Sequence, residues 1–589
     1  MQMQRTILWI VFSMSLLFLW DGWQRHNGKP SMFGGAPPAK TDARPASPAA
    51  GAATGTAGAS DASIPSAPAS AAAPPAAAVP GAPGAPGAAA AGSAPAGAAP
   101  AGAPGARTQA VSLRSDALAL DIDAVGGQVL RAELLRHRAS QDAVGTGSEN
   151  VVLLHDLPGQ VYTAQSGLVG APQGSSFPTH RTPFTVAEGP RELPGGGAEL
   201  KLAAESGGVR LVRSYTLKPG SYVLELSDEV TNTGDAPLRP TLYMQLTRDG
   251  NKPPGESKFY STYTGPVVYT EAQKFQKVDF SDIEKGKGEH AKAASDGWAG
   301  IIQHYFVSAW LPTEKAPREF FTRKIETNLY AVGALQPLGE LAPKASVTAQ
   351  TRLLIAPQDQ RMLENVAPGL DLTVDYGWLT VVAKPIFWLL QYLHGIVANW
   401  GWAIVLLTIV IKTAFFPLQA ASYRSMARMK AVTPRLMQLR ERYGSDRVKL
   451  NQAMMELYKE EKINPLGGCL PIVVQIPVFI ALYWVLLASV EMRNAPWIGW
   501  IHDLATPDPF YVLPLIMAGT MFLQVRLNPT PPDPVQAKVM MVMPIVFSVM
   551  FFFVPSGLVL YWLVNNIYSI AQQWYITRTI EKATAAKKK

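Results

Sequence analysis

Long apolar runs fill the last third of the chain. Five of them approach the roughly 20 residues that a helix needs to cross a bilayer, and they cover residues 400–419, 466–488, 510–525, 539–554 and 557–575. A shorter run, residues 7–20, lies near the N-terminus, and Trp20-Asp21-Gly22-Trp23 follows it where a cleavage site would need small residues. This favours an uncleaved anchor over a cleaved signal peptide. The pattern therefore predicts six membrane spans.

The stretch after the anchor has a very different composition. Residues 24–107 consist mainly of Ala, Pro, Gly and Ser, and no aromatic residue occurs between Phe33 and Tyr162. Such a stretch cannot bury enough apolar surface to offset the entropy lost on ordering. It is predicted to be a disordered tether.

Residues 108–370 carry short segments in which apolar and polar residues alternate. Segments 209–217 and 221–230 flank the turn signal Lys218-Pro219-Gly220 and predict a β-hairpin. The runs at 301–311 and 347–355 continue the strand pattern. We therefore expect one large antiparallel β-sandwich.

Basic residues are distributed unevenly among the loops between the apolar runs. The loop 489–509 holds only Arg493, whereas the C-terminal tail, residues 579–589, is basic. The loop 420–465 holds ten basic residues: Arg424, Arg428, Lys430, Arg435, Arg440, Arg442, Arg447, Lys449, Lys459 and Lys462. Because positive loops stay in the cytoplasm, this loop and the tail are expected inside, and residues 108–370 outside.

The overall composition narrows the class of protein further. Hydrophobic residues make up 48% of the 589 residues and charged residues only 16%, against roughly 25% charged in soluble chains, which argues against a purely cytosolic enzyme. The net charge of +8 lies in loops between spans, which indicates a membrane and no sequence-specific nucleic-acid binding. A single cysteine, Cys469, excludes an intrachain disulfide and a cysteine-rich metal site. No cofactor, metal or catalytic residue is expected.

Two helical segments are expected outside the spans. Residues 384–399 place Pro385 in the first turn and have one apolar face, which suits a helix lying in the outer interface. The basic loop predicts a helical hairpin in which Gly444 ends the first arm and Ser445 caps the second. Its methionines offer a soft surface for varied partners, or simply fill gaps: Met426, Met429, Met437, Met454 and Met455.

Lys412 is the most informative residue, because it lies inside an otherwise apolar span, about eight positions from the expected cytoplasmic end near Ala420. That is ~12 Å along a helix, further than a lysine easily reaches. An ammonium near the bilayer centre costs on the order of 3 kcal/mol, so we expect it to face a polar or hydrated interior. The alternative is a lysine that reaches the interface because the helix ends early at Pro417.

Polar residues in the same spans can accompany this lysine. Each alone is typical of an interhelical hydrogen bond, but together with Lys412 they indicate a wet groove within the bundle. They are Thr408, Gln475, Thr520, Gln524, Asn565 and Asn566.

Two motifs carry a family resemblance. The first is Asn464-Pro465-Leu466-Gly467-Gly468-Cys469-Leu470-Pro471 with Gln475-Ile476-Pro477, and the second is Pro555-Ser556-Gly557-Leu558-Val559-Leu560-Tyr561-Trp562. With them, residues 378–589 resemble YidC, the bacterial inner-membrane protein insertase. The resemblance implies a five-helix core with a hydrophilic groove open to cytoplasm and lipid, and an exported β-supersandwich. Groove positions that touch clients in the family match Thr408, Tyr561 and Trp562, and Lys412 stands where most Gram-negative members carry arginine.

The resemblance also implies the function and the partners. We expect a membrane protein insertase and chaperone acting on nascent inner-membrane proteins, alone or beside the Sec translocon, with the ribosome and membrane lipid as further partners. An ion or solute transporter that uses Lys412, and a tethered carbohydrate enzyme, are the alternatives. In order, the expected parts are an anchor (1–23), a tether (24–107), a periplasmic β-domain (108–370), a linker with an interfacial helix (371–399), the second span (400–419), a cytoplasmic hairpin (420–465), spans three to six (466–578) and a basic tail (579–589).

Overall fold

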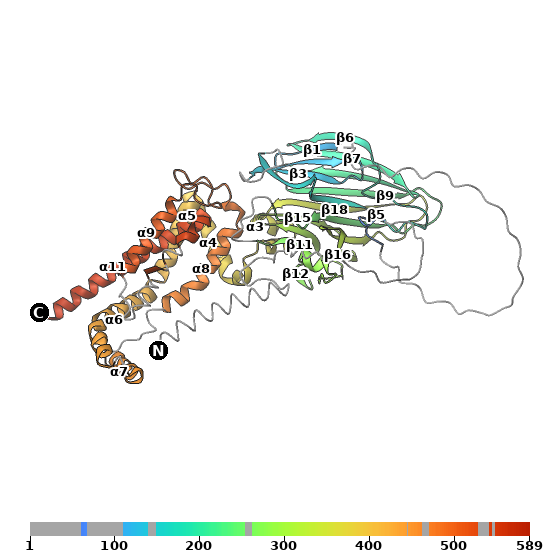
Figure 1. Ribbon diagram of the computed structural model, residues 1–589. Helices are drawn as coiled ribbons and strands as arrows, with labels where there is room; N and C mark the ends of the chain where they lie inside the picture. Colours follow the sequence, from blue (N-terminus) through green and yellow to red (C-terminus); the bar gives the residue numbers. More distant parts are fainter. Residues whose placement is uncertain are drawn as a thin grey trace, which may run out of the picture.

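A β-domain and a helical part lie side by side in the molecule, and a helical hairpin projects from the helical part (Figure 1). The computed structural model describes residues 61–67, 110–139, 149–253, 262–443, 446–461, 470–527, 541–542, 544 and 548–588. The expected N-terminal anchor and part of the expected fifth span lie outside these residues.

The first sheet of the β-domain has nine strands in the order β1-β2-β3-β4-β5-β10-β17-β16-β13. All of its pairings are antiparallel. The strands are β1 Ala110–Arg114, β2 Leu118–Asp123, β3 Val129–Arg138, β4 Asn150–Leu157, β5 Gln160–Val169, β10 Thr241–Asp249, β13 Ala293–Ala294, β16 Arg318–Glu326 and β17 Leu329–Pro337.

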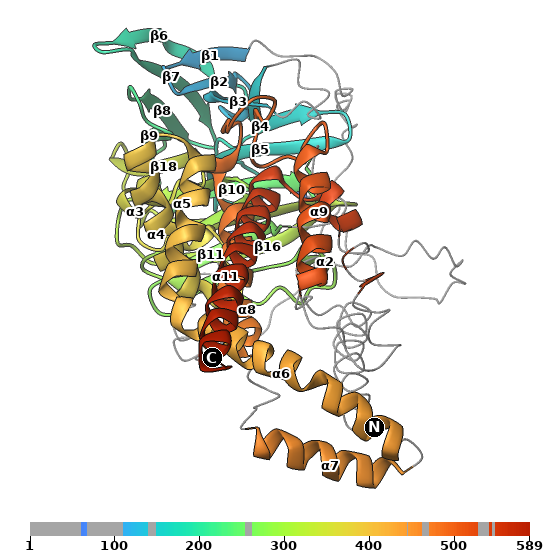
Figure 2. The same cartoon turned by 90° about the vertical axis from the view of Figure 1, so that its left-hand side faces the viewer.

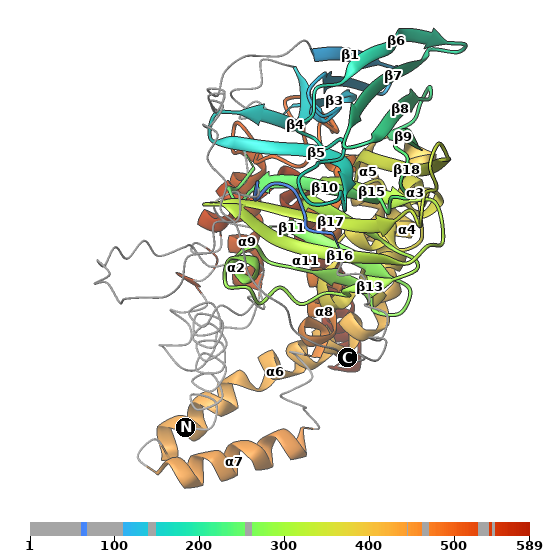
Figure 3. The same ribbon diagram turned by 90° about the vertical axis from the view of Figure 1, so that its right-hand side faces the viewer.

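The second sheet also has nine strands, in the order β12-β11-β14-β15-β18-β9-β8-β7-β6. It packs across the first (Figure 3). The strands are β6 Thr185–Leu193, β7 Gly197–Ser206, β8 Val209–Leu217, β9 Val223–Asn232, β11 Thr264–Thr270, β12 Lys274–Lys277, β14 Trp298–Gln303, β15 Phe306–Pro312 and β18 Ser346–Pro357.

The alternating pattern explains these strands. In β8 every second residue, from Val209 to Leu217, is buried, as expected when one face of a strand packs on a core. The expected hairpin of β8 and β9 is confirmed by their antiparallel pairing. The expected strand signal over 301–311 is divided between β14 and β15, because His304 adopts a positive φ of 50° and the chain turns there.

Short helices connect the β-domain to the longer helices that follow it. The helices are α2 Phe280–Glu284, α3 Gln360–Val366, η1 Leu370–Thr373, η2 Gly377–Leu379, α4 Thr380–Val397, α5 Trp400–Ala414, α6 Phe416–Tyr443, α7 Arg447–Glu460, α8 Leu470–Ala488, η4 Val490–Met492, α9 Val512–Leu527, η5 Phe551–Phe553 and α11 Ser556–Lys588. The helices α5, α8, α9 and α11 gather into one bundle, and α6 and α7 extend away from it (Figure 2).

The expected second span is not one straight helix. α5 ends at Ala414, and the axis turns by 63° into the first part of α6. Pro417, which has no N–H to donate, lies in the first turn of α6. By length and composition, one described helix, Thr380–Val397, suffices to cross a membrane, and this bent pair gives a second candidate.

Two expected helix starts are also wrong. α4 begins at Thr380, so Pro385 lies inside the helix and not in its first turn. Its buried face includes Ile386, Phe387 and Leu390, whereas Trp388 is exposed. In the hairpin, Gly444 and Ser445 lie outside the described residues, and Asp446 is the N-cap of α7, accepting hydrogen bonds from the N–H groups of Val448 and Lys449. A carboxylate is as good an N-cap as a serine hydroxyl, so the sequence alone could not decide between Ser445 and Asp446.

Part of the expected tether is ordered against the β-domain. Residues 61–67 form a turn, and Ser63 and Pro65 within it are buried. A wholly disordered tether is therefore wrong for this short segment, because it finds specific partners on the first sheet.

Candidate substrate groove

Lys412 lies in the last turn of α5 and is only 3% exposed. Its ammonium donates to Ser569 Oγ at 2.8 Å and to Gln475 Oε1 at 3.4 Å. The lysine thus joins three helices, since Ser569 belongs to α11 and Gln475 to α8. Its side chain points into the bundle despite its place near the helix end.

The hydrogen bonds continue from this lysine through amide and hydroxyl groups. Gln475 Nε2 donates to Asn565 Oδ1 at 2.7 Å, and Ser569 Oγ donates to the Asn565 carbonyl at 2.8 Å. Gln419 Nε2 approaches Gln475 Oε1 at 3.4 Å. We call Lys412, Gln419, Gln475, Asn565 and Ser569 the polar cluster.

Every acceptor that faces the lysine is neutral. Over the described part of the chain, no ion pair joins Lys412 to an Asp or Glu. A buried cation without a counter-charge is costly unless water or an incoming polar group solvates it. The polar cluster is thus suited to receive a ligand that carries polar or negative groups.

A cleft beside the polar cluster has mainly apolar walls. Lys412, Gln419 and Gln475 line it together with four apolar side chains, which are Ile411, Phe415, Leu418 and Val474. The cleft lies where α5 bends into α6 and α8 passes beside them. The cleft thus presents one cation and two amide groups within an apolar surface.

Aromatic side chains continue the apolar surface along α8 and α11. Phe479 stacks on Tyr561 with ring centroids 6.2 Å apart and meets Trp562 edge-on at 4.4 Å. Phe551 contacts Trp562 at 5.0 Å. Tyr561 is buried and Trp562 half-buried, and Trp562 Nε1 has no hydrogen-bond partner among the described residues.

The structure groups only some of the expected groove residues. Lys412, Gln475 and Asn565 share the polar cluster, whereas Asn566 donates to Thr520 Oγ1 on α9 at 2.9 Å. Thr408 is fully buried and donates to the carbonyl of Ile404 in its own helix at 2.7 Å. It therefore lies one turn from Lys412 without a hydrogen bond to it.

Sequence reasoning missed two members of the polar cluster, Gln419 and Ser569. Ser569 lies four residues after Asn565, on the same helical face, and this spacing was the available signal. Gln419 is the last residue of the expected span 400–419. The bend at Phe415 turns the chain so that Gln419 reaches Gln475 on α8.

The methionines of the hairpin are divided between two environments. Met429 and Met454 pack against the small core of Val432, Leu436 and Leu457 that joins α6 to α7. Met437 and Met455 are exposed. The side chain of Met426 lies outside the described part.

Histidines of the β-domain do not form a common site. Burial lowers the pKa of His137, His180 and His304 to about 4, so each is neutral at pH 7. His155 and His290 lie on other parts of the domain. Among the described residues, no group of three or more His, Cys, Asp or Glu side chains is placed to hold a metal ion.

Comparisons with known proteins decide the family. Residues 110–389 match the model described as the YidC periplasmic domain, and residues 392–583 match that described as the 60Kd inner membrane protein. The membrane protein insertase YidC of Bordetella pertussis is 56% identical over 597 residues, covering 100% of this chain and 99% of the relative. That of Cupriavidus necator is 53% identical over 599 residues, with the same coverage. The chain belongs to the YidC family of membrane protein insertases.

The resemblance drawn from the two sequence motifs is thereby confirmed over the whole chain. Among solved structures, an active YidC insertase with its first transmembrane domain resolved matches with a TM-score of 0.37 and 16% identity, covering 80% of this chain and 93% of that one. Membership of the YidC family favours the insertase over the two alternatives, a transporter and a carbohydrate enzyme.

Proposed function

We propose that this chain inserts nascent membrane proteins through a groove whose hydrated wall is the polar cluster. The observation that carries the proposal is the burial of Lys412 among neutral oxygens only. Such a cation attracts acidic or polar client segments by Coulomb interaction in a site of low dielectric. A polar segment bound there gives up less hydration free energy than it would in the hydrocarbon core.

The apolar walls have a complementary task. Ile411, Phe415 and Val474 border the cleft, and Phe479 and Trp562 continue an apolar surface on α8 and α11. An apolar client segment loses water on this surface and passes sideways into lipid. Tyr561, which is buried, supports this surface by stacking on Phe479, and Thr408 is buried one turn before Lys412.

The topology follows from the charge of the loops. We place the N-terminal anchor and five further spans in the bacterial inner membrane, the β-domain in the periplasm, and the hairpin and tail in the cytoplasm. The basic residues of the hairpin and tail are suited to salt-sensitive contacts with a translating ribosome. Sec translocon clients would enter the same groove from the side that is open to lipid.

Replacing Lys412 tests the proposal. Proteoliposomes with Lys412→Ala should insert a small client with an acidic translocated segment about tenfold less efficiently, since the attraction and the hydration are both lost. Lys412→Arg should retain most of the activity, because it keeps the charge. Lys344→Ala, which removes an exposed cation from the β-domain, is the matched control. Unchanged insertion by Lys412→Ala would remove the cation from the mechanism.

A further inference from the structure

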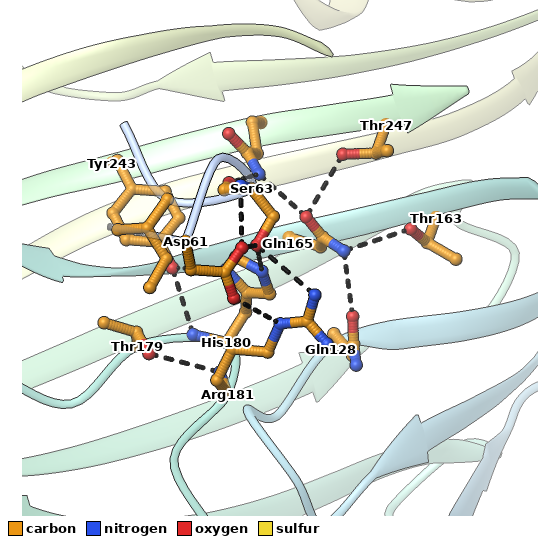
Figure 4. A network of polar contacts seen from close by, with 12 residues as sticks. Asp61, Ser63, Gln128, Thr163, Gln165, Thr179, His180, Arg181, Tyr243 and Thr247 are labelled. Atoms are coloured by element: carbon orange, nitrogen blue, oxygen red, sulfur yellow. Dashed lines mark hydrogen bonds and ion pairs between the residues drawn. The ribbon is translucent and has the colours of Figure 1, made fainter. Parts of the chain in front are cut away.

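The short segment 61–67 of the linker occupies a built site on the first sheet. Its sequence is Asp61-Ala-Ser-Ile-Pro-Ser-Ala67. Around it lie His180 and Arg181 of the loop after β5 and Tyr243 of β10 (Figure 4), together with residues of β16. Within residues 34–106, Ile64 is the only Ile, Leu, Met or aromatic residue, and Asp61 is one of only two acids. The segment thus combines a large aliphatic side chain with an acid, a combination that the rest of this stretch lacks.

The segment is shaped by its own side chains. The Ser63 N–H and hydroxyl both donate to Asp61 Oδ1, at 2.9 and 2.7 Å, and the Ile64 N–H donates to the Asp61 carbonyl at 3.1 Å. This is the turn that Asp and Ser favour locally. The chain therefore presents Ile64 and two carbonyls to the sheet with less entropy to lose.

Polar groups of the β-domain bind both the side chains and the backbone of the segment. Arg181 Nε pairs with Asp61 Oδ2 at 3.2 Å, and His180 Nε2 lies 3.1 Å from Ser63 Oγ. Gln245 Nε2 donates to the Ser63 carbonyl at 2.9 Å.

Arg323 makes the most extensive contact. Its guanidinium donates to the Ile64 carbonyl at 2.9 Å, to the Ser63 carbonyl, and to Gln245 Oε1 at 2.9 Å. A guanidinium fork that reads two successive carbonyls fixes the position of the chain along the sheet.

Apolar packing completes the site. Ile64 packs with Val169, Tyr243, Leu335 and Phe321, which form a small cluster separate from the main core. This cluster lies on the face of the first sheet away from the sandwich interior. Without the segment, a patch of two aromatic rings and two aliphatic side chains would be left without this cover.

The polar side chains of the site are buried and held in place. His180 and Gln245 are 1% and 0% exposed. His180 Nδ1 contacts Tyr243 OH at 2.6 Å, and Gln245 Nε2 also donates to Gln165 Oε1 at 2.7 Å. Buried donors aimed at a segment cost free energy if that segment leaves them unpaired. The site is therefore preorganised for a peptide with this pattern of carbonyls.

We propose that residues 61–67 are an intramolecular peptide ligand that docks the middle of the linker on this face of the β-domain. The face recognises an acid, a hydroxyl, an aliphatic side chain and two exposed carbonyls in the order Asp-x-Ser-Ile-Pro. Docking shortens the connection between the anchor and the domain from residues 24–109, which span at most ~290 Å when extended, to residues 24–60, which span at most ~130 Å. Release frees both the linker and a peptide-binding face.

Hydrogen exchange of the full chain in nanodiscs tests this docking. Amides of residues 61–67 should exchange at least ~10-fold more slowly than those of the flanking Ala-rich stretches. Arg323→Ala should raise their exchange toward the flanking rate. Arg239→Ala, which breaks only the exposed pair with Glu340 on the same domain, is the matched control and should leave exchange unchanged.

A change in the segment itself separates docking from domain folding. Ile64→Gly leaves every β-domain residue intact and should also remove the protection of residues 61–67. A fluorescent peptide of the 61–67 sequence should then bind Ile64→Gly at least ~10-fold more tightly than the natural chain, whose face the tethered copy fills at millimolar effective concentration. Flanking-rate exchange of residues 61–67 in the natural chain, or protection that survives both variants, would overturn the proposal.

Discussion

Arg213 and Lys412 are two of the buried cations among the described residues, and their surroundings differ. Arg213 on β8 is 0% exposed, and its Nε and Nη2 atoms donate to the two carboxylate oxygens of Asp228 on β9, at 2.5 and 3.1 Å. The two residues face each other in the strand register. Lys412 is 3% exposed, and its two hydrogen-bond partners are a hydroxyl and an amide oxygen.

The two environments differ in whether a carboxylate neutralises the charge. The Arg213 charge is neutralised within the fold, and Nη1 reaches the Ser166 carbonyl on the other sheet at 3.5 Å, so the pair joins the layers of the β-domain. The charge of Lys412 is stabilised only by the dipoles of neutral side chains. A cation left without a carboxylate remains able to bind one that arrives with a client.

The largest expected effect comes from breaking the neutralised pair. Arg213→Ala should lower the free energy of unfolding of the β-domain by ~3–5 kcal/mol, because Asp228 is left buried and unpaired. Hydrogen exchange of the β8 and β9 amides measures this loss. The control is the double variant Arg213→Met with Asp228→Leu, which removes both charges and should lose much less stability. A similar loss in the two variants would show that packing, and not the ion pair, is at stake.

Removing Lys412, the cation without a carboxylate partner, should change stability little but lower insertion. Lys412→Met leaves no buried carboxylate behind, so the thermal stability of the helical part in nanodiscs should stay within ~1 kcal/mol or rise. Insertion should nevertheless fall, as with Lys412→Ala. A destabilisation as large as that of Arg213→Ala would mean that Lys412 is a structural residue like Arg213.

An intermediate effect is expected from Gln475, which bonds both Lys412 and Asn565. Gln475→Leu removes one partner of the ammonium and leaves Ser569 as its acceptor, so insertion should fall less than in Lys412→Ala. This bond, at 3.4 Å, is the longer of the two that the ammonium makes, so its loss should cost less than the about tenfold loss expected for Lys412→Ala. The same proteoliposome assay measures the insertion efficiency of Gln475→Leu. A loss of insertion equal to that of Lys412→Ala would show that the polar cluster acts as one unit.

A separate effect, on the pH dependence of stability, concerns a buried acid beyond α8. Burial, aided by Asp359, raises the pKa of Glu491 in η4 from 4.5 to about 7. Between these values the folded carboxyl is protonated and the unfolded one is ionised, so stability should fall as pH rises from about 4.5 to 7 and level off above. Glu491→Gln should flatten this slope in thermal unfolding scans at several pH values. An unchanged slope would assign it to another group.

How far the sequence predicted this site depended on how unusual each residue is in its surroundings. Lys412 was recognisable because a charge in an apolar run has few structural explanations. The burial of Arg213 could not be predicted, because an arginine in an alternating strand normally faces water. Ser569 was missed since a helical serine is ordinary, and its role needs the position of a different helix.

The fold was predictable in the same uneven way. The alternation of β8 and β9 specified a hairpin directly, whereas the bend at Phe415 and the turn at His304 depend on how neighbouring elements pack. The order of residues 61–67 was hidden by the composition around it. The one available signal was Ile64, alone among small residues.

Water should reach Lys412 from the cytoplasmic side, and thiol labelling tests this access most directly. Lys412→Cys would be placed in a Cys469→Ser background and exposed to a membrane-impermeant maleimide in inverted vesicles. Leu407→Cys, fully buried on the same helix, is the unreactive control, and Lys449→Cys on the hairpin is the reactive one. We predict that the cysteine at 412 is labelled and that a bound client protects it. A cysteine at 412 as unreactive as that at 407 would contradict the groove.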